Sequence, residues 1–293
     1  MKVSPLTDAF GVIVEGVDLD AVSPQTFGDL RALFEEHSAL VFKRQGLSED
    51  AHLRLAAQFG PIEDREADER KPDDPFTVPA VSNETETGGV TGAMDFRTLN
   101  LKANQQWHID STFLPVPALC NIITAKVLPS SGGETELASS RAAWAAMPER
   151  LRAQIRGKIL GHNLRRSREV LSKELADLPM FNKWPPQRWP AVWTNPVNGR
   201  ESLYLASHAF EIEGMDKTEG RAVLDELIAF CAQPQFTYSH SWEVDDVLIW
   251  DQRAVLHRGM PWPYDEPRTL KSTCTSMQGH DGLDAALAAV GRA

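Results

Sequence analysis

The sequence has few cysteines, no long apolar run and no excess of basic residues, and each shortage excludes a class of protein. Its three cysteines, Cys120, Cys231 and Cys274, are odd in number and far apart. Neither a disulfide framework nor a cysteine-based metal site is therefore predicted, and a reducing cytoplasm is the expected location. No stretch approaches the roughly 20 apolar residues that a membrane-spanning helix needs, and the first residues lack the apolar core of a signal peptide. We therefore expect a cytoplasmic protein without a membrane partner.

The charge balance is acidic. Asp and Glu number 41 against 30 Lys and Arg, which gives a formal net charge of −11. Binding a nucleic acid requires a basic face, so no nucleic acid partner is expected. A small anionic substrate would need a local cationic pocket that attracts it against the overall negative field.

The chain has 293 residues, of which 42% are hydrophobic, and can therefore bury a substantial core. No internal repeat or low-complexity linker divides it, so we expect one domain over residues 1–293. Residues 63–104 stand out because they are charged, rich in Pro, Gly and Thr, and without sustained periodicity. A structureless segment of this length is usually a functional or a disordered loop. We interpret it as a lid over an active site.

Local patterns predict a few helices among many short strands. Four helices are expected. The first begins at Ser23-Pro24, the second runs from Ser48 to Gly60-Pro61, and the other two span residues 140–155 and 217–232. Strands are expected at 10–18, 39–42, 119–127, 158–166, 191–204 (around an Asn-Gly turn), 236–242, 247–250, 254–257 and 268–276. This pattern favours a mainly β fold with flanking helices, either a β-sandwich or a jelly roll.

One short motif suggests metal chemistry. In Trp107-His108-Ile109-Asp110, an imidazole and a carboxylate lie two residues apart, and on a strand this spacing points both side chains to one face. Two His and one carboxylate form the facial triad of non-haem iron oxygenases, which leaves coordination positions open. The alternative interpretation is a hydrogen-bonded His-Asp pair at the surface.

A late stretch supplies the remaining candidates. His257 ends an apolar strand, and Arg268 begins the next strand. An Arg at this place can bind the far carboxylate of a dicarboxylic cosubstrate with two parallel hydrogen bonds. The alternative interpretation is two core strands with a buried His.

These motifs resemble the taurine dioxygenase and aryloxyacetate dioxygenase family (TauD/TfdA), and the resemblance runs nearly end to end. The matching stretches are Leu40-Val-Phe42, Ser82-Asn83, Asn104–Phe113, Gly132-Gly-Glu-Thr135, Arg141-Ala-Ala-Trp144, Leu203–Ala209 and Trp250-Asp to Arg268. The Arg141 and Leu203–Ala209 stretches are more similar to the aryloxyacetate branch.

The resemblance implies a double-stranded β-helix (jelly roll) that uses Fe(II), 2-oxoglutarate and dioxygen. It implies that the iron ligands and catalytic centre are His108, Asp110 and His257. It further implies that Thr135 and Arg268 bind 2-oxoglutarate, that Trp250 packs beside it, and that Asn104 contacts the substrate. The retained carboxylate of Asp110 argues against a halogenating variant.

The sequence departs from the family at the substrate side. Members that act on taurine or aryloxyacetates carry a second Arg about four residues after the cosubstrate Arg, and here that inward-facing position is Ser272. Lys271 carries a charge but should point away unless a bulge turns it. Lys271, Ser272 and His208 are the substrate-side candidates, with a structural role left open for His208. Other basic candidates are Arg97, Lys102, Arg165, Arg166 and Arg168.

The expected activity is hydroxylation of a small organic acid, and cleavage of an aryloxyalkanoate ether to a phenol and an oxoacid is one form that this activity could take. Two alternatives stay open: a dioxygenase for a sulfonate or an amino-acid-like biosynthetic intermediate, and a catalytically silent jelly-roll binding protein. We also expect a homo-oligomer. The Trp-rich segment 178–193 is interpreted as a hydrophobic gate, a packed loop or a subunit contact.

Overall fold

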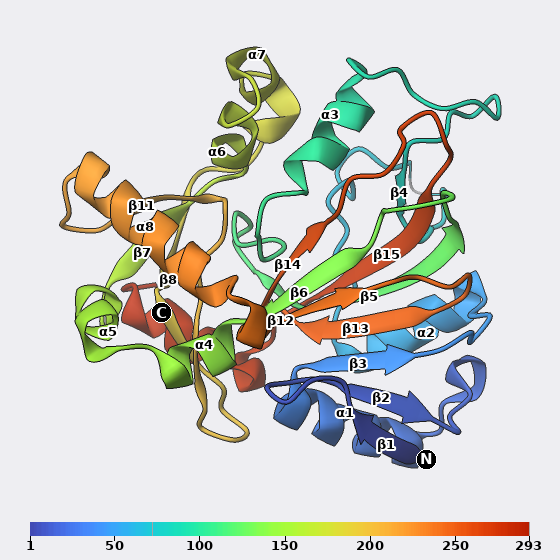
Figure 1. Ribbon diagram of the computed structural model, residues 1–293, viewed down its shortest axis with the longest axis horizontal. Helices are drawn as coiled ribbons and strands as arrows, with labels where there is room; N and C mark the ends of the chain where they lie inside the picture. The colour runs from blue at the N-terminus through green and yellow to red at the C-terminus, as the bar shows by residue number, and fades with distance from the viewer. Residues whose placement is uncertain (72, 293) are drawn as a thin grey trace.

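A seven-stranded sheet forms the main layer of the computed structural model, which describes residues 1–71 and 73–292 (Figure 1). Pro72, inside the expected lid, and Ala293 lie outside the described residues. In order across the sheet, the strands are β1 (Lys2–Pro5), β2 (Val12–Glu15), β3 (Ala39–Phe42), β13 (Val247–Asp251), β5 (Ala118–Val127), β15 (Thr269–Ser276) and β4 (Ala80–Ser82). All neighbours are antiparallel except β2 and β3.

A smaller sheet faces the central strands of the main one. Its order is β12 (Thr237–His240), β6 (Thr135–Ser139) and β14 (Val255–Gly259). Leu137 and Val255 from this sheet share a buried cluster with Ile123, Leu248 and Leu270 from the main sheet. The two sheets thus enclose one apolar core between them, which confirms the prediction of a mainly β, double-stranded β-helix fold.

Helices cover the outer face of the main sheet. Helices α1 (Pro24–His37) and α2 (Glu49–Phe59) bury Phe34 and Leu55 in a second cluster with Leu40 of β3 (Figure 1). Both helices begin where the sequence predicts, because the hydroxyls of Ser23 and Ser48 accept backbone N–H bonds at their first turns.

The remaining elements gather at one end of the sandwich. They include a three-stranded sheet of β11 (Ala209–Ile212), β7 (Ile159–His162) and β8 (Gln187–Pro190), and a hairpin of β9 (Val192–Thr194) and β10 (Glu201–Leu203). The helices here are α4 (Ser140–Ala146), α5 (Glu149–Ile155), α8 (Lys217–Cys231) and α9 (Leu283–Ala289) (Figure 1). Short 3-10 helices span Leu19–Ala21, Pro179–Phe181, Pro234–Phe236 and Gly279–Asp281.

Two predicted elements are wrong in extent. The helix expected at 140–155 is two helices, since Pro148 lies between α4 and α5 and a proline interrupts helical hydrogen bonding. The strand expected at 158–166 stops at His162, because the side chain of Asn163 accepts the N–H of Arg166 at 2.7 Å and starts α6 (Leu164–Glu169). A short helix, α7 (Lys173–Ala176), follows.

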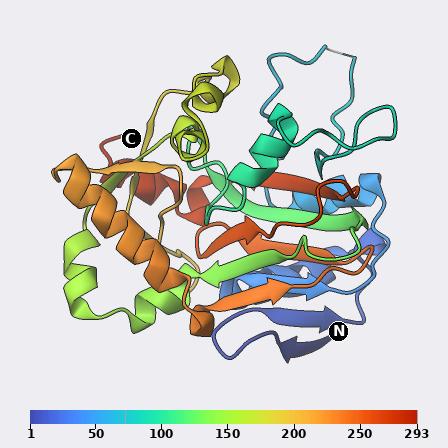
Figure 2. The same ribbon diagram turned by 45° about the horizontal axis from the view of Figure 1, so that its top comes forward.

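The segment 63–104 is not wholly irregular. It contributes strand β4 to the main sheet and helix α3 (Phe96–Ala103), whose first turn is capped by Asp95. Figure 2 shows the rest of this segment projecting beyond the sheets, with α3 beside α6.

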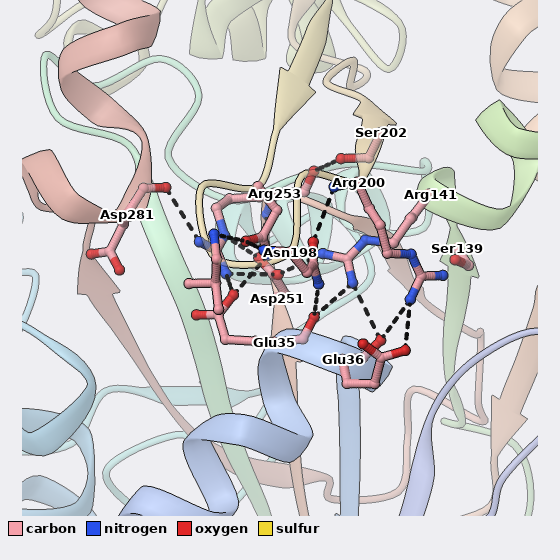
Figure 3. Close-up of polar contacts among 12 residues, drawn as sticks. Glu35, Glu36, Ser139, Arg141, Asn198, Arg200, Ser202, Asp251, Arg253 and Asp281 are labelled. Atoms are coloured by element: carbon pink, nitrogen blue, oxygen red, sulfur yellow. Dashed lines mark hydrogen bonds and ion pairs between the residues drawn. The ribbon is translucent and has the colours of Figure 1, made fainter.

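A buried network of charges connects three elements (Figure 3). Arg253 lies 2.6 Å from Glu35 of α1 and 2.9 Å from Asp251 at the end of β13. Arg141 of α4 lies 3.3 Å from the same Asp251. Each cation here has a carboxylate partner inside the protein, so the charges compensate one another.

No helix among the described residues is long and apolar enough to cross a membrane.

We expect Arg253→Met to destabilise the fold by about 3 kcal/mol, because the buried carboxylates of Glu35 and Asp251 would each lose one cation partner and keep only Arg31 and Arg141, respectively. Urea denaturation followed by circular dichroism measures this change. The control is Lys2→Met, which removes an exposed ion pair with Glu15 and should leave the denaturation midpoint unchanged. Equal midpoints for Arg253→Met and the parent protein would contradict the stabilising role of the network.

Candidate metal and cosubstrate site

Two segments far apart in the sequence meet through their backbones at His108 and His257. The N–H of His108 donates to the carbonyl of His257 at 3.0 Å, and the reverse bond measures 2.8 Å. His257 belongs to β14, whereas His108 forms an isolated bridge and Asp110 lies in the turn that follows. The expectation that strand alternation points His108 and Asp110 to one face is therefore wrong. A turn after the bridge at His108 brings Asp110 to the histidines.

The three predicted ligands converge. His108, Asp110 and His257 each offer one ligand atom, and these atoms all lie within 4.8 Å of one another. Nε2 of His108 is 3.8 Å from Oδ1 of Asp110, and Nε2 of His257 is 3.4 Å from Oδ2. Two imidazoles and one carboxylate at such separations fit a divalent transition metal with several positions left open.

Neighbouring groups orient these side chains. Nδ1 of His108 lies 2.7 Å from the carbonyl of Gln106, to which it donates, and this leaves Nε2 as the free lone pair. Oδ2 of Asp110 accepts from the amides of Asn121 at 2.9 Å and Gln252 at 2.8 Å. With Oδ2 held by two amides, Oδ1 is the oxygen left for a metal. Asn121 and Gln252 were not predicted, although a polar Asn within the apolar run 119–127 was a usable indication.

The protonation states suit metal binding. Burial, together with a smaller contribution from the charge of His108, lowers the pKa of His257 to about 3. Burial alone would raise the pKa of Asp110, but His257, His108 and Arg65 outweigh it, so this pKa lies below its ordinary value. Neutral imidazoles and an ionised carboxylate are the forms that bind metal.

Arg268 is buried close to this centre without a carboxylate partner among the described residues. It is 3% exposed, donates to the carbonyl of Gly133 at 3.1 and 2.7 Å, and lies over the ring of Trp262 at 4.8 Å. Burial lowers its pKa to about 10, so it remains charged at neutral pH. A buried guanidinium with neutral partners is suited to receive the carboxylate of a ligand.

Gly133 keeps Arg268 in place because it has no side chain. Its φ is +74°, and a Cβ built there would lie 2.8 Å from Nε of Arg268. A Cβ built on the neighbouring Gly132, at φ +73°, would lie 2.5 Å from the carbonyl oxygen of Pro261. The Gly-Gly pair therefore permits the close approach of this loop to the guanidinium.

Thr135 and Trp250 lie next to these groups. Thr135 pairs with Gly259, two residues after His257, and its hydroxyl accepts from Trp242 at 3.1 Å. The O–H of Thr135 therefore remains free to donate a hydrogen bond to a ligand. The ring of Trp250 is 4.6 Å from that of His257.

An aromatic wall, formed by Phe113, Trp184 and His208, lies beside the triad. The ring of His208 is 6.0 Å from that of His108 and 5.0 Å from that of Phe113, which is 5.6 Å from Trp184. His208 also bonds Thr112 through Nδ1 at 3.2 Å. Within segment 178–193, Trp184 thus packs on Phe113, while the indole N–H of the fully buried Trp189 donates to the carbonyl of Thr112.

The other substrate-side candidates lie as follows. The hydroxyl of Ser272 donates to Asn121 at 2.9 Å, so it supports the residue that holds Asp110. The amine of Lys271 donates to the carbonyl of Val78 at 3.0 Å, and its charge acts on His52 of α2, on the outer face of the sheet. Asn104 ends α3, and its carbonyl accepts the N–H of Gly259 at 2.9 Å, at the end of β14.

Comparison with known proteins was consistent in both sequence and structure. Residues 2–274 match the model of the family described as taurine catabolism dioxygenase TauD, TfdA family. The chain is 34% identical to the alpha-ketoglutarate-dependent 2,4-dichlorophenoxyacetate dioxygenase of Cupriavidus pinatubonensis, over 93% of this chain and 96% of that protein. It is 33% identical to the (S)-phenoxypropionate/alpha-ketoglutarate-dioxygenase of Sphingobium herbicidovorans, over 92% of each chain. The crystal structure of AAD-2 in complex with Mn(II) and N-oxalylglycine superposes with a TM-score of 0.86 and 29% identity, over 94% of this chain and 98% of that one.

We expect Gln252→Leu to weaken Fe(II) binding about 10–100-fold, because Oδ2 of Asp110 would lose one of the amides that orient it. Anaerobic titration calorimetry measures the affinity. His257→Ala should abolish binding, and Gln25→Leu, at an exposed helix position, should not change it. Full Fe(II) affinity in the His257→Ala protein would show that the metal binds elsewhere.

Proposed function

The chain belongs to the TauD/TfdA family of dioxygenases, and on that premise we propose that it oxidises an aryloxyalkanoate at an iron held by His108, Asp110 and His257. The observation that carries the proposal is the convergence of these three ligand atoms within 4.8 Å. The enzyme is a 2-oxoglutarate-dependent dioxygenase, as its relatives are. The substrates in the names of these relatives, 2,4-dichlorophenoxyacetate and phenoxypropionate, support the substrate class.

An iron held by His108, Asp110 and His257 would supply the oxidation, in which dioxygen and 2-oxoglutarate would give succinate and carbon dioxide and one oxygen atom would be inserted into a C–H bond of the substrate. If that carbon bears an ether oxygen, the hydroxylated product is a hemiacetal, which breaks down to a phenol and an oxoacid. The protein contributes binding, orientation and exclusion of water.

The proposed 2-oxoglutarate site combines Arg268 and Thr135. The buried, charged guanidinium of Arg268 would donate two parallel hydrogen bonds to the distal carboxylate of 2-oxoglutarate. The hydroxyl of Thr135 would donate a hydrogen bond to the same carboxylate. Trp250, packed on His257, limits the space beside the cosubstrate. These roles follow the family pattern and the absence of any other carboxylate on Arg268 within the described residues.

The aromatic wall is the proposed binding surface for the apolar part of the substrate. The ring of Phe113 lies between those of His208 and Trp184, and His208 is the member of the wall nearest to His108. Aromatic faces pack well against an aryl group. Asn104, whose carbonyl accepts the N–H of Gly259 at the end of β14, is proposed to border the same space.

We further propose that segment 63–104 acts as the lid. Arg65, from this segment, donates to Ser111, next to Asp110, at 2.9 Å. The amine of Lys183, from the Trp-rich segment, holds Asp68 and Glu69 at 2.7 and 2.8 Å. Both contacts link the projecting segment to the site, as expected of a loop that closes over a substrate.

A cytoplasmic location, a homo-oligomeric state and the lack of a nucleic acid or membrane partner stay predictions of the sequence. The alternative of a catalytically silent binding protein is disfavoured, because such a protein would need neither the complete triad nor Arg268. The sulfonate and amino-acid alternatives are distinguished by the substrate screen below.

With Fe(II), 2-oxoglutarate and oxygen, we expect 2,4-dichlorophenoxyacetate to stimulate succinate formation and release an equal amount of the phenol. Succinate and phenol are measured by chromatography, with taurine and amino acids as comparison substrates. Stimulation by a sulfonate or an amino acid alone would replace the aryloxyalkanoate assignment. Stimulation by none of them in iron-loaded protein would favour the silent binding protein.

We expect Arg268→Met to raise the KM for 2-oxoglutarate at least about 30-fold, because truncating one partner of a buried charge pair costs about 2–5 kcal/mol. Initial rates at varied 2-oxoglutarate give this constant. Arg150→Met removes an exposed ion pair with Glu226 and is the matched control. An unchanged KM in Arg268→Met would place the cosubstrate carboxylate on another residue.

A further inference from the structure

Four arginines of the described residues are fully buried, and they fall into two pairs. Arg141 and Arg253 have carboxylate partners in the network of Figure 3. Arg168 and Arg268 have none among the described residues, with exposures of 6% and 3%. A buried cation without an internal anion is unfavourable for stability, so its presence indicates a ligand that supplies the anion. Arg268 has such a ligand in 2-oxoglutarate, whereas Arg168 has no assigned role.

The immediate neighbours of Arg168 are all neutral. Its guanidinium donates to the hydroxyl of Ser167 at 2.6 Å and to Oδ1 of Asn100 at 2.5 Å, and lies 5.0 Å from the ring of Phe181. Nε is buried and has no hydrogen-bond partner. Since each terminal nitrogen carries a second hydrogen, Nε–H and one terminal N–H remain available as a fork that matches a carboxylate.

Arg168 lies next to the strand segment that carries His108. The carbonyl of Ser167 accepts from the side chain of Gln106 at 2.7 Å, and the carbonyl of Gln106 holds Nδ1 of His108 at 2.7 Å. Burial lowers the pKa of Arg168 to about 10, with Asp110 acting in the opposite direction, so these charges lie within each other's field. The guanidinium therefore stays charged at neutral pH, and its charge also contributes to the lowered pKa of His208, after burial and His108.

The other basic candidates near the site are already engaged or exposed. Arg65 is paired with Glu63 at 2.5 Å, and Lys271 is bonded to Val78 on the far face. Arg165 is paired with Asp177 at 2.6 Å, Arg166 with Glu169 at 3.9 Å, and Arg97 is exposed. With Arg268 assigned to the cosubstrate, Arg168 is the buried cation that remains available for the substrate anion.

We propose that Arg168 binds the anionic group of the primary substrate, in place of the second arginine that the sequence lacks after Arg268. The inference rests on the proposed function and adds a named binding residue to it. Asn100 of α3 and Ser167 of α6 are positioning residues that hold the guanidinium from two sides. The proposed ligand is a small carboxylate, specifically an aryloxyalkanoate.

Binding is measured by calorimetry under anaerobic conditions on protein loaded with Fe(II) and 2-oxoglutarate, so turnover is not needed. The probes are 2,4-dichlorophenoxyacetate and its uncharged primary amide. Arg168→Met should weaken binding of the acid at least about 30-fold, as for loss of one partner of a buried ion pair, and leave binding of the amide unchanged. The neighbouring Arg165→Met, which removes a surface ion pair, is the matched control and should bind both probes as the parent does.

Asn100→Asp tests the same idea without removing the arginine. It is nearly isosteric and places a carboxylate on Arg168, which should then compete with the acid and weaken its binding, while affinity for 2-oxoglutarate stays unchanged. Acid binding that is unaltered in both variants overturns the proposal, as does equal loss of acid and amide in Arg168→Met, or a parent protein that does not prefer the acid.

The proposed reaction and the proposed anion site can be disproved separately. If the parent binds the acid through Arg168 but releases no phenol in air, the proposed reaction falls and the anion site stands. If phenol is released equally well by the parent and by Arg168→Met at low acid concentration, the reaction stands and the anion site falls.

Discussion

The site depends on one backbone interaction, the pair of hydrogen bonds between His108 and His257. These bonds, at 3.0 and 2.8 Å, join a segment before β5 to strand β14, almost 150 residues later in the chain. Because both partners are metal-ligand candidates, the same contact that joins the segments also sets the separation of the imidazoles. Asp110 then needs only the following turn, and the amides of Asn121 and Gln252, to face them. The ligand geometry is thus a property of strand pairing in the jelly roll, which is rigid, and not of flexible side chains.

Buried charge is distributed in two different ways in this protein. On the helix-covered side, Arg141 and Arg253 are neutralised by Glu35 and Asp251, and the network connects α1, β13 and α4. Around the metal centre, Arg168 and Arg268 are surrounded by amides, hydroxyls, carbonyls and aromatic rings. Leaving a buried cation without an anion costs stability, and proteins accept that cost at binding sites. This contrast distinguishes the arginines of the structural network from the two that are proposed to bind ligands.

The electrostatics also explain how an acidic protein binds anions. The formal net charge is −11, so the overall field repels a carboxylate. Arg168 and Arg268 act at short range and from within a low-dielectric interior, where a charge interacts far more strongly than at the surface. In the proposed arrangement, two separate cations would let cosubstrate and substrate bind at one iron without competing for the same arginine.

The sequence by itself determined the reaction class, the fold class and the identity of the metal-ligand candidates, because these depend on residue types at short spacing and on strand patterns. His-x-Asp, the Gly132-Gly133 pair before Thr135, and the helix caps at Ser23 and Ser48 are all local features, and the structure places each where the pattern indicated. Only the tertiary structure decided which cation faces the substrate. Arg165, Arg166 and Arg168 are equivalent in sequence, and the strand predicted through 158–166 misplaced the first two. The cap at Asn163 starts a helix there, and that helix turns Arg168 alone inward toward Asn100, away from the surface carboxylates that pair with its neighbours. Burial and the lack of a partner are relations between distant segments, so no local pattern can encode them.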